Sequence, residues 1–239
     1  MSQARDPRML AARNILIVAP HADDESLGCG GLAAILARDG RHFHTLFVTD
    51  GGASHRNSPT WPRPALAAKR LQEAEDALAI LGLGVMPRSF LDLPDADLPE
   101  EGSSGWDAAL GVIRAVAAGF GPDLVLLPWR RDPHSDHRAA WHLVTQALAL
   151  EGLTPDRLEY AIWLDELGAA DDHPRPGEMR RVSFDIAAAV ETKRAAVAAH
   201  LSQTTALIDD DPDGFRLDET TIARLTGPIE SYWQDGQAD

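Results

Sequence analysis

Short apolar runs of strand length alternate with longer amphipathic stretches, and this alternation restricts the fold more than any other feature of the sequence. We expect strands at the apolar runs 14–19, 42–49, 88–91 and 123–128. Apolar residues then recur at three- and four-residue spacing, as in helices with one buried face, at 26–38, 64–81, 106–120 and 138–150. Four successive strand-helix units predict an open, mostly parallel, Rossmann-like α/β sheet with helices on both faces.

The last third of the chain is predicted less completely. Strands are expected at 159–164 and 180–186, followed by a helix at 187–201. From about residue 204 the chain is rich in Asp, Gly, Pro and Thr, and no element is predicted there. Since 239 residues are within the range of one large α/β domain, we expect a single domain over 1–239 with a less regular C-terminal segment.

Charge and cysteine content disfavour several classes of protein. The 22 Lys and Arg residues against 37 Asp and Glu give a formal charge of −15, which disfavours nucleic acid or an anionic membrane as the main partner. The single cysteine, Cys29, excludes an intrachain disulfide framework. Residues 1–13 lack the apolar core of a signal peptide, and no apolar run approaches the roughly 20 residues that span a bilayer. We expect a soluble, cytoplasmic protein and leave its oligomeric state open, a homo-oligomer included.

Two clusters of polar residues directly follow predicted strands. Residues 21–25 (His-Ala-Asp-Asp-Glu) come after the first strand, and residues 132–137 (Asp-Pro-His-Ser-Asp-His) come after the fourth. In an open parallel sheet, ligands bind at the carboxyl ends of the strands where the strand order reverses. If the first and fourth strands are neighbours at that point, the two clusters face each other across one crevice.

The side chains of these clusters favour a metal-dependent hydrolase. Two imidazoles and one carboxylate suit Zn²⁺ as a three-ligand site whose fourth position is open to water. Bound Zn²⁺ lowers the pKa of its water to about 7, and a neighbouring carboxylate can accept the proton as the water attacks a carbonyl. A nearby histidine can then donate to the tetrahedral intermediate. The pattern therefore predicts hydrolysis of a carbonyl or amide bond.

The two clusters together resemble the motifs of the LmbE-like, or PIG-L, deacetylases. This family removes acyl groups from amino-sugar conjugates and includes N-acetylglucosaminyl-phosphatidylinositol de-N-acetylases. The resemblance rests on the segments 20–25 and 132–138, and it extends to 70–73, the loop around Asp95 and 193–203. It therefore spans most of the chain up to about residue 205.

The resemblance implies a metal site and a base. His21, Asp24 and His137 would be the zinc ligands, and Asp23 would be the general base that takes a proton from the zinc-bound water. The implied cofactor is therefore Zn²⁺, and the implied reaction is hydrolysis of an N-acyl group.

Further roles follow from the same resemblance. His134 would stabilise or protonate the intermediate, and Asp136 would orient His134 through a hydrogen bond. Arg70 and Asp95 match positions of substrate contact, Arg70 for a sugar hydroxyl or phosphate. The role of Glu25 stays open.

The chain departs from the family pattern in two respects. Ala22 and Ser135 stand where proline is usual, although no functional side chain is lost. Some members also use a tyrosine close to the second cluster to polarise the carbonyl, whereas this chain has only Tyr160 and Tyr232. The origin of an extra oxyanion donor stays open.

Simpler structural explanations compete with these roles. The acids at 23–25 could only stabilise a helix N-terminus, although the histidines of both clusters favour a metal site. Arg70 could be solvated on its helix, and His200 could only interact with a helix C-terminus. We expect Cys29 to be a small buried residue and not a nucleophile.

The expected function is zinc-dependent removal of an acetyl group from an N-acetylglucosamine-type small molecule or glycoconjugate. The alternative within the same class is an amidase of another N-acyl compound, such as a thiol conjugate or an acylated antibiotic sugar. A metal-dependent phosphoesterase is disfavoured by the acidic site, and a non-catalytic metal- or sugar-binding protein has no need of a base such as Asp23. We expect the loop at 50–64 and the segment after 204 to hold the specificity.

Overall fold

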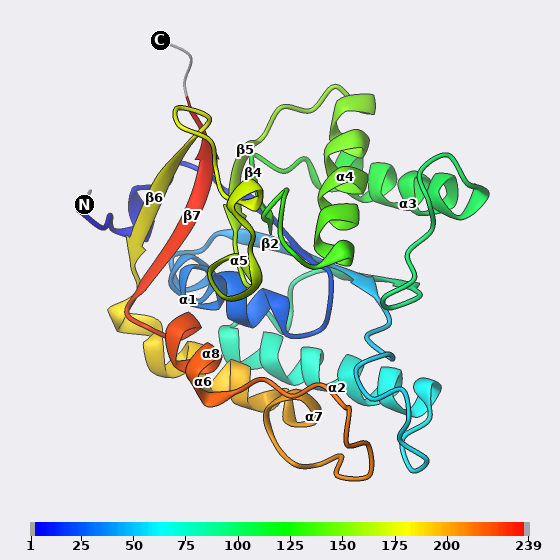
Figure 1. Cartoon of the computed structure of the whole chain (residues 1–239). Helices are drawn as coiled ribbons and strands as arrows, with labels where there is room; N and C mark the ends of the chain where they lie inside the picture. The colour runs from blue at the N-terminus through cyan, green and yellow to red at the C-terminus, as the bar shows by residue number, and fades with distance from the viewer. Residues whose placement is uncertain (1–2, 237–239) are drawn as a thin grey trace.

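The structure, a computed structural model, describes residues 3–236, so the ends of the domain expected over 1–239 lie outside the described residues. Its centre is a seven-stranded sheet with the strand order β3-β2-β1-β4-β5-β7-β6 (Figure 1). The strands are β1 (Asn14–Ala19), β2 (His42–Thr49), β3 (Arg88–Leu93), β4 (Leu124–Pro128), β5 (Asp156–Tyr160), β6 (Met179–Asp185) and β7 (Ile229–Asp235). The pairs from β3 to β5 are parallel, whereas β7 is antiparallel to β5 and β6. The predicted mostly parallel α/β fold is confirmed.

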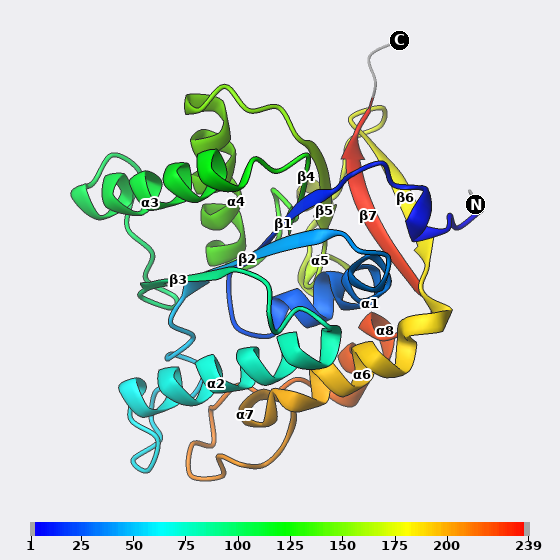
Figure 2. The ribbon, with the colours of Figure 1, turned by 180° about the vertical axis from the view of Figure 1, so that it is seen from behind.

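Helices cover both faces of the sheet (Figure 2). One face carries α1 (Asp24–Arg38), α2 (Arg63–Leu81), α6 (Val190–Ala199), α7 (Leu201–Thr204) and α8 (Glu219–Leu225). The other carries α3 (Ser104–Phe120) and α4 (Ser135–Leu150). Connections contain α5 (Leu164–Leu167) and 3-10 turns at Pro7–Met9, Ala170–Asp172 and Ala187–Ala189. Within residues 3–236, no helix combines the length and apolar character that crossing a membrane requires.

The central strand β1 is buried on both of its faces. Ile15 and Ile17 pack in the core beneath α1, α2 and α6, while Leu16 and Val18 pack in the core beneath α3 and α4. A strand covered on both sides needs apolar residues at every position, which explains the unbroken apolar run in the sequence.

Strands β1 and β4 are neighbours at the point where the strand order reverses. From β1 the chain proceeds to β2 and β3 on one side, and then returns to β4 on the other side of β1. Ile15 pairs with Leu124 and Ile17 pairs with Leu126 in parallel. The loops after β1 and β4 therefore leave the same edge of the sheet, as the sequence predicts.

The last third of the chain differs from the predicted elements. Leu124 pairs with Asp156 and Pro128 pairs with Tyr160, so β5 ends where its partner ends, and the strand predicted at 159–164 is displaced. The helix predicted at 187–201 is interrupted at its end, where His200 separates α6 from α7.

The segment after residue 204, for which no element is predicted, contains α8 and β7. Strand β7 lies between β5 and β6, where Tyr232 pairs with Tyr160 on one side and with Val182 on the other. The C-terminal segment is thus part of the sheet. Because packing against distant strands stabilises β7, its local sequence gives only a weak signal.

Candidate metal-dependent active site

The two polar clusters meet above the carboxyl ends of β1 and β4, as predicted. His21 and Asp23 precede α1 and Asp24 begins it, while His134 precedes α4 and His137 lies in its first turn. A cavity of about 590 Å³ opens between the loops, and His21, Asp23, Asp24 and His134 line it.

His21, Asp24 and His137 lie close enough to share one metal ion. One ligand atom from each lies within 4.8 Å of the other two, and all three residues are buried. Asp24 Oδ2 is 3.2 Å from His21 Nδ1 and 3.3 Å from His137 Nε2. Both ring nitrogens of His137 are buried without a hydrogen bond to any described residue. A divalent cation bound between His21, Asp24 and His137 would satisfy Nε2 of His137, which faces Asp24, and two imidazoles with one carboxylate suit Zn²⁺.

His134 differs from His137 in its access to the cavity. A second set of potential ligand atoms, from His21, His134 and Asp136, also lies within 4.8 Å. However, His134 is only partly buried and lines the cavity, whereas His137 is fully buried behind it. This arrangement suits His137 for binding a metal and His134 for contact with a substrate.

The electrostatic environment also separates these two histidines. Burial alone lowers the pKa of His137, but the carboxylates of Asp24 and Asp132 outweigh burial and raise it to about 9. Burial lowers the pKa of His134 to about 4, with a further contribution from the positive charges of His21 and His137. The pocket around His137 therefore stabilises positive charge, whereas His134 is a neutral imidazole at pH 7.

Asp23 lies beside the candidate metal ligands and has an unusual backbone conformation. Its φ of +143° and ψ of −26° lie in a region that residues other than glycine rarely adopt. Its Oδ2 is 3.2 Å from Arg70 Nη2. Burial nevertheless raises the pKa of Asp23 to about 6, against the lowering effect of Arg70. A carboxyl group with this pKa can accept and release a proton near neutral pH.

Arg70 and Asp95, the residues expected to contact substrate, both line the cavity. Arg70 also contacts the backbone: Nη1 donates to Gly51 O and Nη2 donates to Ala22 O. It is 3% exposed, so it is not a solvated surface arginine. Asp95 Oδ1 lies 3.3 Å from His21 Nε2, which links the loop after β3 to a candidate metal ligand.

Asp136 contacts a different histidine from the one expected. Its Oδ2 is 3.1 Å from His21 Nε2 and accepts a hydrogen bond from Ala96 N–H. The group that contacts His134 is the backbone N–H of Asp136, which donates to His134 Nδ1 at 3.2 Å. The expected side-chain contact between Asp136 and His134 is therefore wrong, because the start of α4 directs this carboxylate toward the first cluster.

Asp132 is a buried member of the second cluster for which no role is predicted. Its Oδ1 is 3.4 Å from His137 Nδ1, and its carboxylate accepts hydrogen bonds from the backbone N–H groups of His134 and Trp163. This contact orients the imidazole with Nε2 toward Asp24. The sequence signal for this role was the position of Asp132, a few residues before the candidate ligand His137.

Glu25 and His200 form a pair away from the cavity. His200 Nε2 lies 3.0 Å from Glu25 Oε1, and both side chains are fully buried. The His200 side chain therefore interacts with a carboxylate of α1. A role limited to a helix C-terminus does not account for this contact.

The two tyrosines and the cysteine lie in the interior. Tyr160 donates to Val18 O, and Tyr232 donates to Glu230 Oε2. Both are 1% exposed and neither lines the cavity, so neither can supply an oxyanion donor from this position. Cys29 is buried, as expected.

Part of the cavity wall comes from the two segments expected to hold the specificity. Ser54 and Asn57 belong to the loop after β2, and Asp211 and Phe215 belong to the segment after residue 204. Two hydrogen bonds join the segments: Asn57 N–H donates to the Asp211 carboxylate, and Phe215 N–H donates to the backbone oxygen of Ser54. The Phe215 ring packs edge-to-face on Trp163, which adds an apolar surface beside the polar one.

Known proteins resemble this chain in sequence and in fold. The family model described as "PIG-L: GlcNAc-PI de-N-acetylase" matches residues 16–148, which include both polar clusters. The 1D-myo-inositol 2-acetamido-2-deoxy-alpha-D-glucopyranoside deacetylase of Rhodococcus opacus is 28% identical over 247 residues, covering 82% of this chain and 83% of its own. The diacetylchitobiose deacetylase of Thermococcus kodakarensis is 29% identical over 208 residues, covering 80% of this chain and 70% of its own.

A solved structure with the same fold has a different reaction in its name. The 4-carboxy-2-hydroxymuconate hydratase GalB of Pseudomonas putida has a TM-score of 0.69 at 16% identity, with 95% of this chain and 97% of that one covered. At this identity the likeness is one of fold alone. The reaction must therefore be argued from the family and from the site.

Proposed function

This chain belongs to the PIG-L family of GlcNAc-PI de-N-acetylases, and from that premise we propose that it removes the acetyl group from an N-acetylglucosamine-containing small molecule. The relatives from Rhodococcus opacus and Thermococcus kodakarensis are named for different acetylated amino sugars. The acetylated amine is the chemistry that these names share. The observation that carries the proposal is the buried His21–Asp24–His137 cluster with Asp23 beside it at the cavity.

We propose that His21, Asp24 and His137 hold one divalent metal ion, with Zn²⁺ as the ion that these donors suit best. When bound, the ion would polarise the amide carbonyl and lower the pKa of a water molecule. Asp132, which contacts Nδ1 of His137, would keep Nε2 of His137 directed at the ion. Asp136 and Asp95, which contact Nε2 of His21, would keep Nδ1 of His21 directed at it.

Asp23 would act as the general base. Its carboxylate lines the cavity next to the metal-binding residues, and its pKa of about 6 leaves it ionised and able to accept a proton at neutral pH. The proton taken from the attacking water can then pass to the leaving amine. Arg70, which contacts Asp23 Oδ2, keeps the carboxylate in place.

His134 would stabilise the oxygen of the tetrahedral intermediate. Its Nδ1 accepts a hydrogen bond from Asp136 N–H, so the proton of the neutral ring is carried by Nε2. A neutral imidazole that lines the cavity can donate this N–H to the developing negative charge. We propose sugar contacts for Arg70 and Asp95, because both line the same cavity.

The proposal also includes a cytoplasmic location and a free small-molecule substrate. The single cysteine is compatible with a reducing cytoplasm, and the charge of −15 argues against nucleic acid or an anionic membrane as the partner. A homo-oligomer stays a prediction.

Release of free amine from a panel of N-acetylglucosamine conjugates by zinc-loaded protein tests the proposal, with metal-stripped protein as the blank. We expect turnover that depends on the metal and differs among aglycones. Turnover only on other N-acyl compounds would replace the sugar with a different acyl amide. Hydration of an unsaturated acid without amide cleavage would contradict the proposed reaction.

A further inference from the structure

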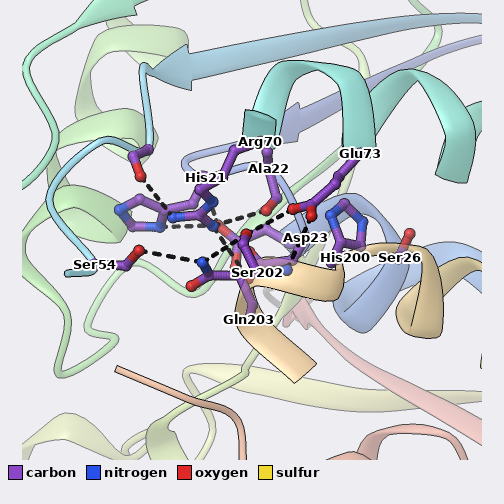
Figure 3. Close-up of polar contacts among 12 residues, drawn as sticks. His21, Ala22, Asp23, Ser26, Ser54, Arg70, Glu73, His200, Ser202 and Gln203 are labelled. Carbon is purple, nitrogen blue, oxygen red and sulfur yellow. Dashed lines mark hydrogen bonds and ion pairs between the residues drawn. The ribbon is translucent and has the colours of Figure 1, made fainter. Parts of the chain in front are cut away.

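The peptide group between Ala22 and Asp23 is held at both of its ends by buried side chains. Its carbonyl oxygen accepts a hydrogen bond from Arg70 Nη2 at 2.7 Å, and its N–H donates to Glu25 Oε2 at 3.0 Å. Arg70 is 3% exposed and Glu25 is 0% exposed. Figure 3 shows Arg70 reaching this peptide from α2.

These contacts continue into a closed ring through α7 and α2. Glu25 Oε1 lies 3.0 Å from His200 Nε2, at the start of α7. Ser202, in the same short helix, donates from its backbone N–H and its hydroxyl to Glu73 at 2.9 and 2.6 Å (Figure 3). Glu73 lies one turn after Arg70 on α2, so the ring returns to the Ala22–Asp23 peptide.

The composition of this ring argues for a role beyond stability. Arg70, Glu25 and Glu73 are charged and buried, and removing charges from water costs free energy that apolar residues of similar volume do not require. The backbone conformation of Asp23 adds a further cost, and such strain persists only where the surroundings over-determine it. The ring supplies that restraint.

We propose that Glu25 and His200 are positioning residues that hold the Ala22–Asp23 peptide in its strained conformation and thereby direct the Asp23 carboxylate into the active site. This inference rests on the proposed function, in which Asp23 is the base. Glu25 and His200 are fully buried and do not line the cavity, so they act through Asp23 and not on the substrate.

The contacts define what each residue must supply. Both carboxylate oxygens of Glu25 must act as hydrogen-bond acceptors. Oε2 accepts from Asp23 N–H, while Oε1 accepts from the Ser26 hydroxyl and faces His200. His200 needs a donor at Nε2, whereas its buried Nδ1 has no hydrogen-bond partner among the described residues. A glutamine at position 200 keeps a donor near the place of Nε2, whereas an alanine removes it.

Kinetics of His200→Ala and His200→Gln test the proposal. A displaced base slows the chemical step and leaves substrate binding intact, so His200→Ala should lower kcat by about tenfold to a hundredfold. Its KM should stay within about twofold and its metal content should stay at the wild-type value. His200→Gln should recover most of the lost kcat.

Tyr232→Phe is the matched control. It removes one buried hydrogen bond to Glu230, whose carboxylate accepts from the backbone N–H groups of Gly31 and Leu32 in α1. The substitution therefore loosens α1 without changing any of the contacts that link Glu25, His200 and Arg70. We expect a lower Tm with kcat unchanged. Should His200→Ala show only this pattern, His200 is structural and the proposal is wrong.

A crystal structure of Glu25→Ala gives a direct readout that does not require activity. We expect φ of Asp23 to relax to a negative value and the carboxylate to leave its place beside Arg70. A retained φ near +143° would overturn the proposal. Wild-type protein that cleaves no amide would contradict the proposed function, and φ of Asp23 in Glu25→Ala would still decide this inference.

Discussion

The two polar clusters follow neighbouring parallel strands, yet they are held in different ways. Local contacts hold the backbone of the second cluster, where Asp132 Oδ1 accepts from His134 N–H and His134 Nδ1 accepts from Asp136 N–H, while Trp163 N–H donates to Asp132 Oδ2 from farther along the chain. Its backbone at His134 has an ordinary extended conformation. The first cluster instead has a positive φ at Asp23 and depends on Arg70 from α2 and, through Glu25, on the start of α7. Substitutions far along the chain should therefore disturb the first cluster more than the second.

The largest effect is expected from the residue that joins both clusters at the proposed metal site. His137→Ala removes one of the three proposed ligands, so the protein should lose its metal and its turnover together. Metal content after dialysis and amine release measure the two quantities. A variant that keeps both its metal and its turnover would exclude His137 as a ligand.

Asp132→Asn tests the local support of the second cluster. Asparagine keeps an oxygen near His137 Nδ1 but removes the negative charge, so metal affinity should fall by about tenfold to a hundredfold. Excess zinc should restore most of the turnover. Titration with a zinc chelator measures the affinity. An unchanged affinity would show that Asp132 does not act on the metal through His137.

Arg70→Lys and Arg138→Lys compare the long-range support with the local one. Arg70 binds Gly51 O, Ala22 O and Asp23, and lysine cannot reproduce this forked geometry, so kcat should fall by about tenfold or more. Arg138 is exposed, and its side chain donates hydrogen bonds to the nearby backbone oxygens of Asp132 and Pro133, so its change should alter kcat by less than about threefold. Equal losses in the two variants would contradict the comparison.

Tyr160→Phe should have the smallest effect on catalysis. The hydroxyl donates to Val18 O in the interior, so its loss should lower the free energy of unfolding by about 1 kcal/mol and leave kcat unchanged. Chemical denaturation and amine release measure the two. A large loss of kcat at normal stability would show that Tyr160 reaches the substrate.

The parts of the fold that depend on local sequence were predictable. The helices at 26–38, 64–81, 106–120 and 138–150 end where predicted, and two of them end at Gly82 and Gly121, whose positive φ suits a C-terminal cap. They begin one to three residues earlier, since side chains such as Ser103 and His134 accept hydrogen bonds at the N-termini.

The meeting of the clusters was predicted on the condition that β1 and β4 are neighbours where the strand order reverses, and the observed strand order meets that condition. Strand β7 was not, since its partners β5 and β6 lie far from it in the sequence. The contact of Asp136 with His21 and the pairing of Glu25 with His200 span 115 and 175 residues. Motif spacing cannot determine such side-chain pairings.

Zinc content and amine release of Asp23→Asn test the central claim most directly. Asparagine keeps the shape of the side chain but cannot accept the proton, so the variant should bind zinc as the wild type does and lose about a hundredfold to ten-thousandfold in kcat. Full turnover in Asp23→Asn, with zinc bound, would contradict the account of this site.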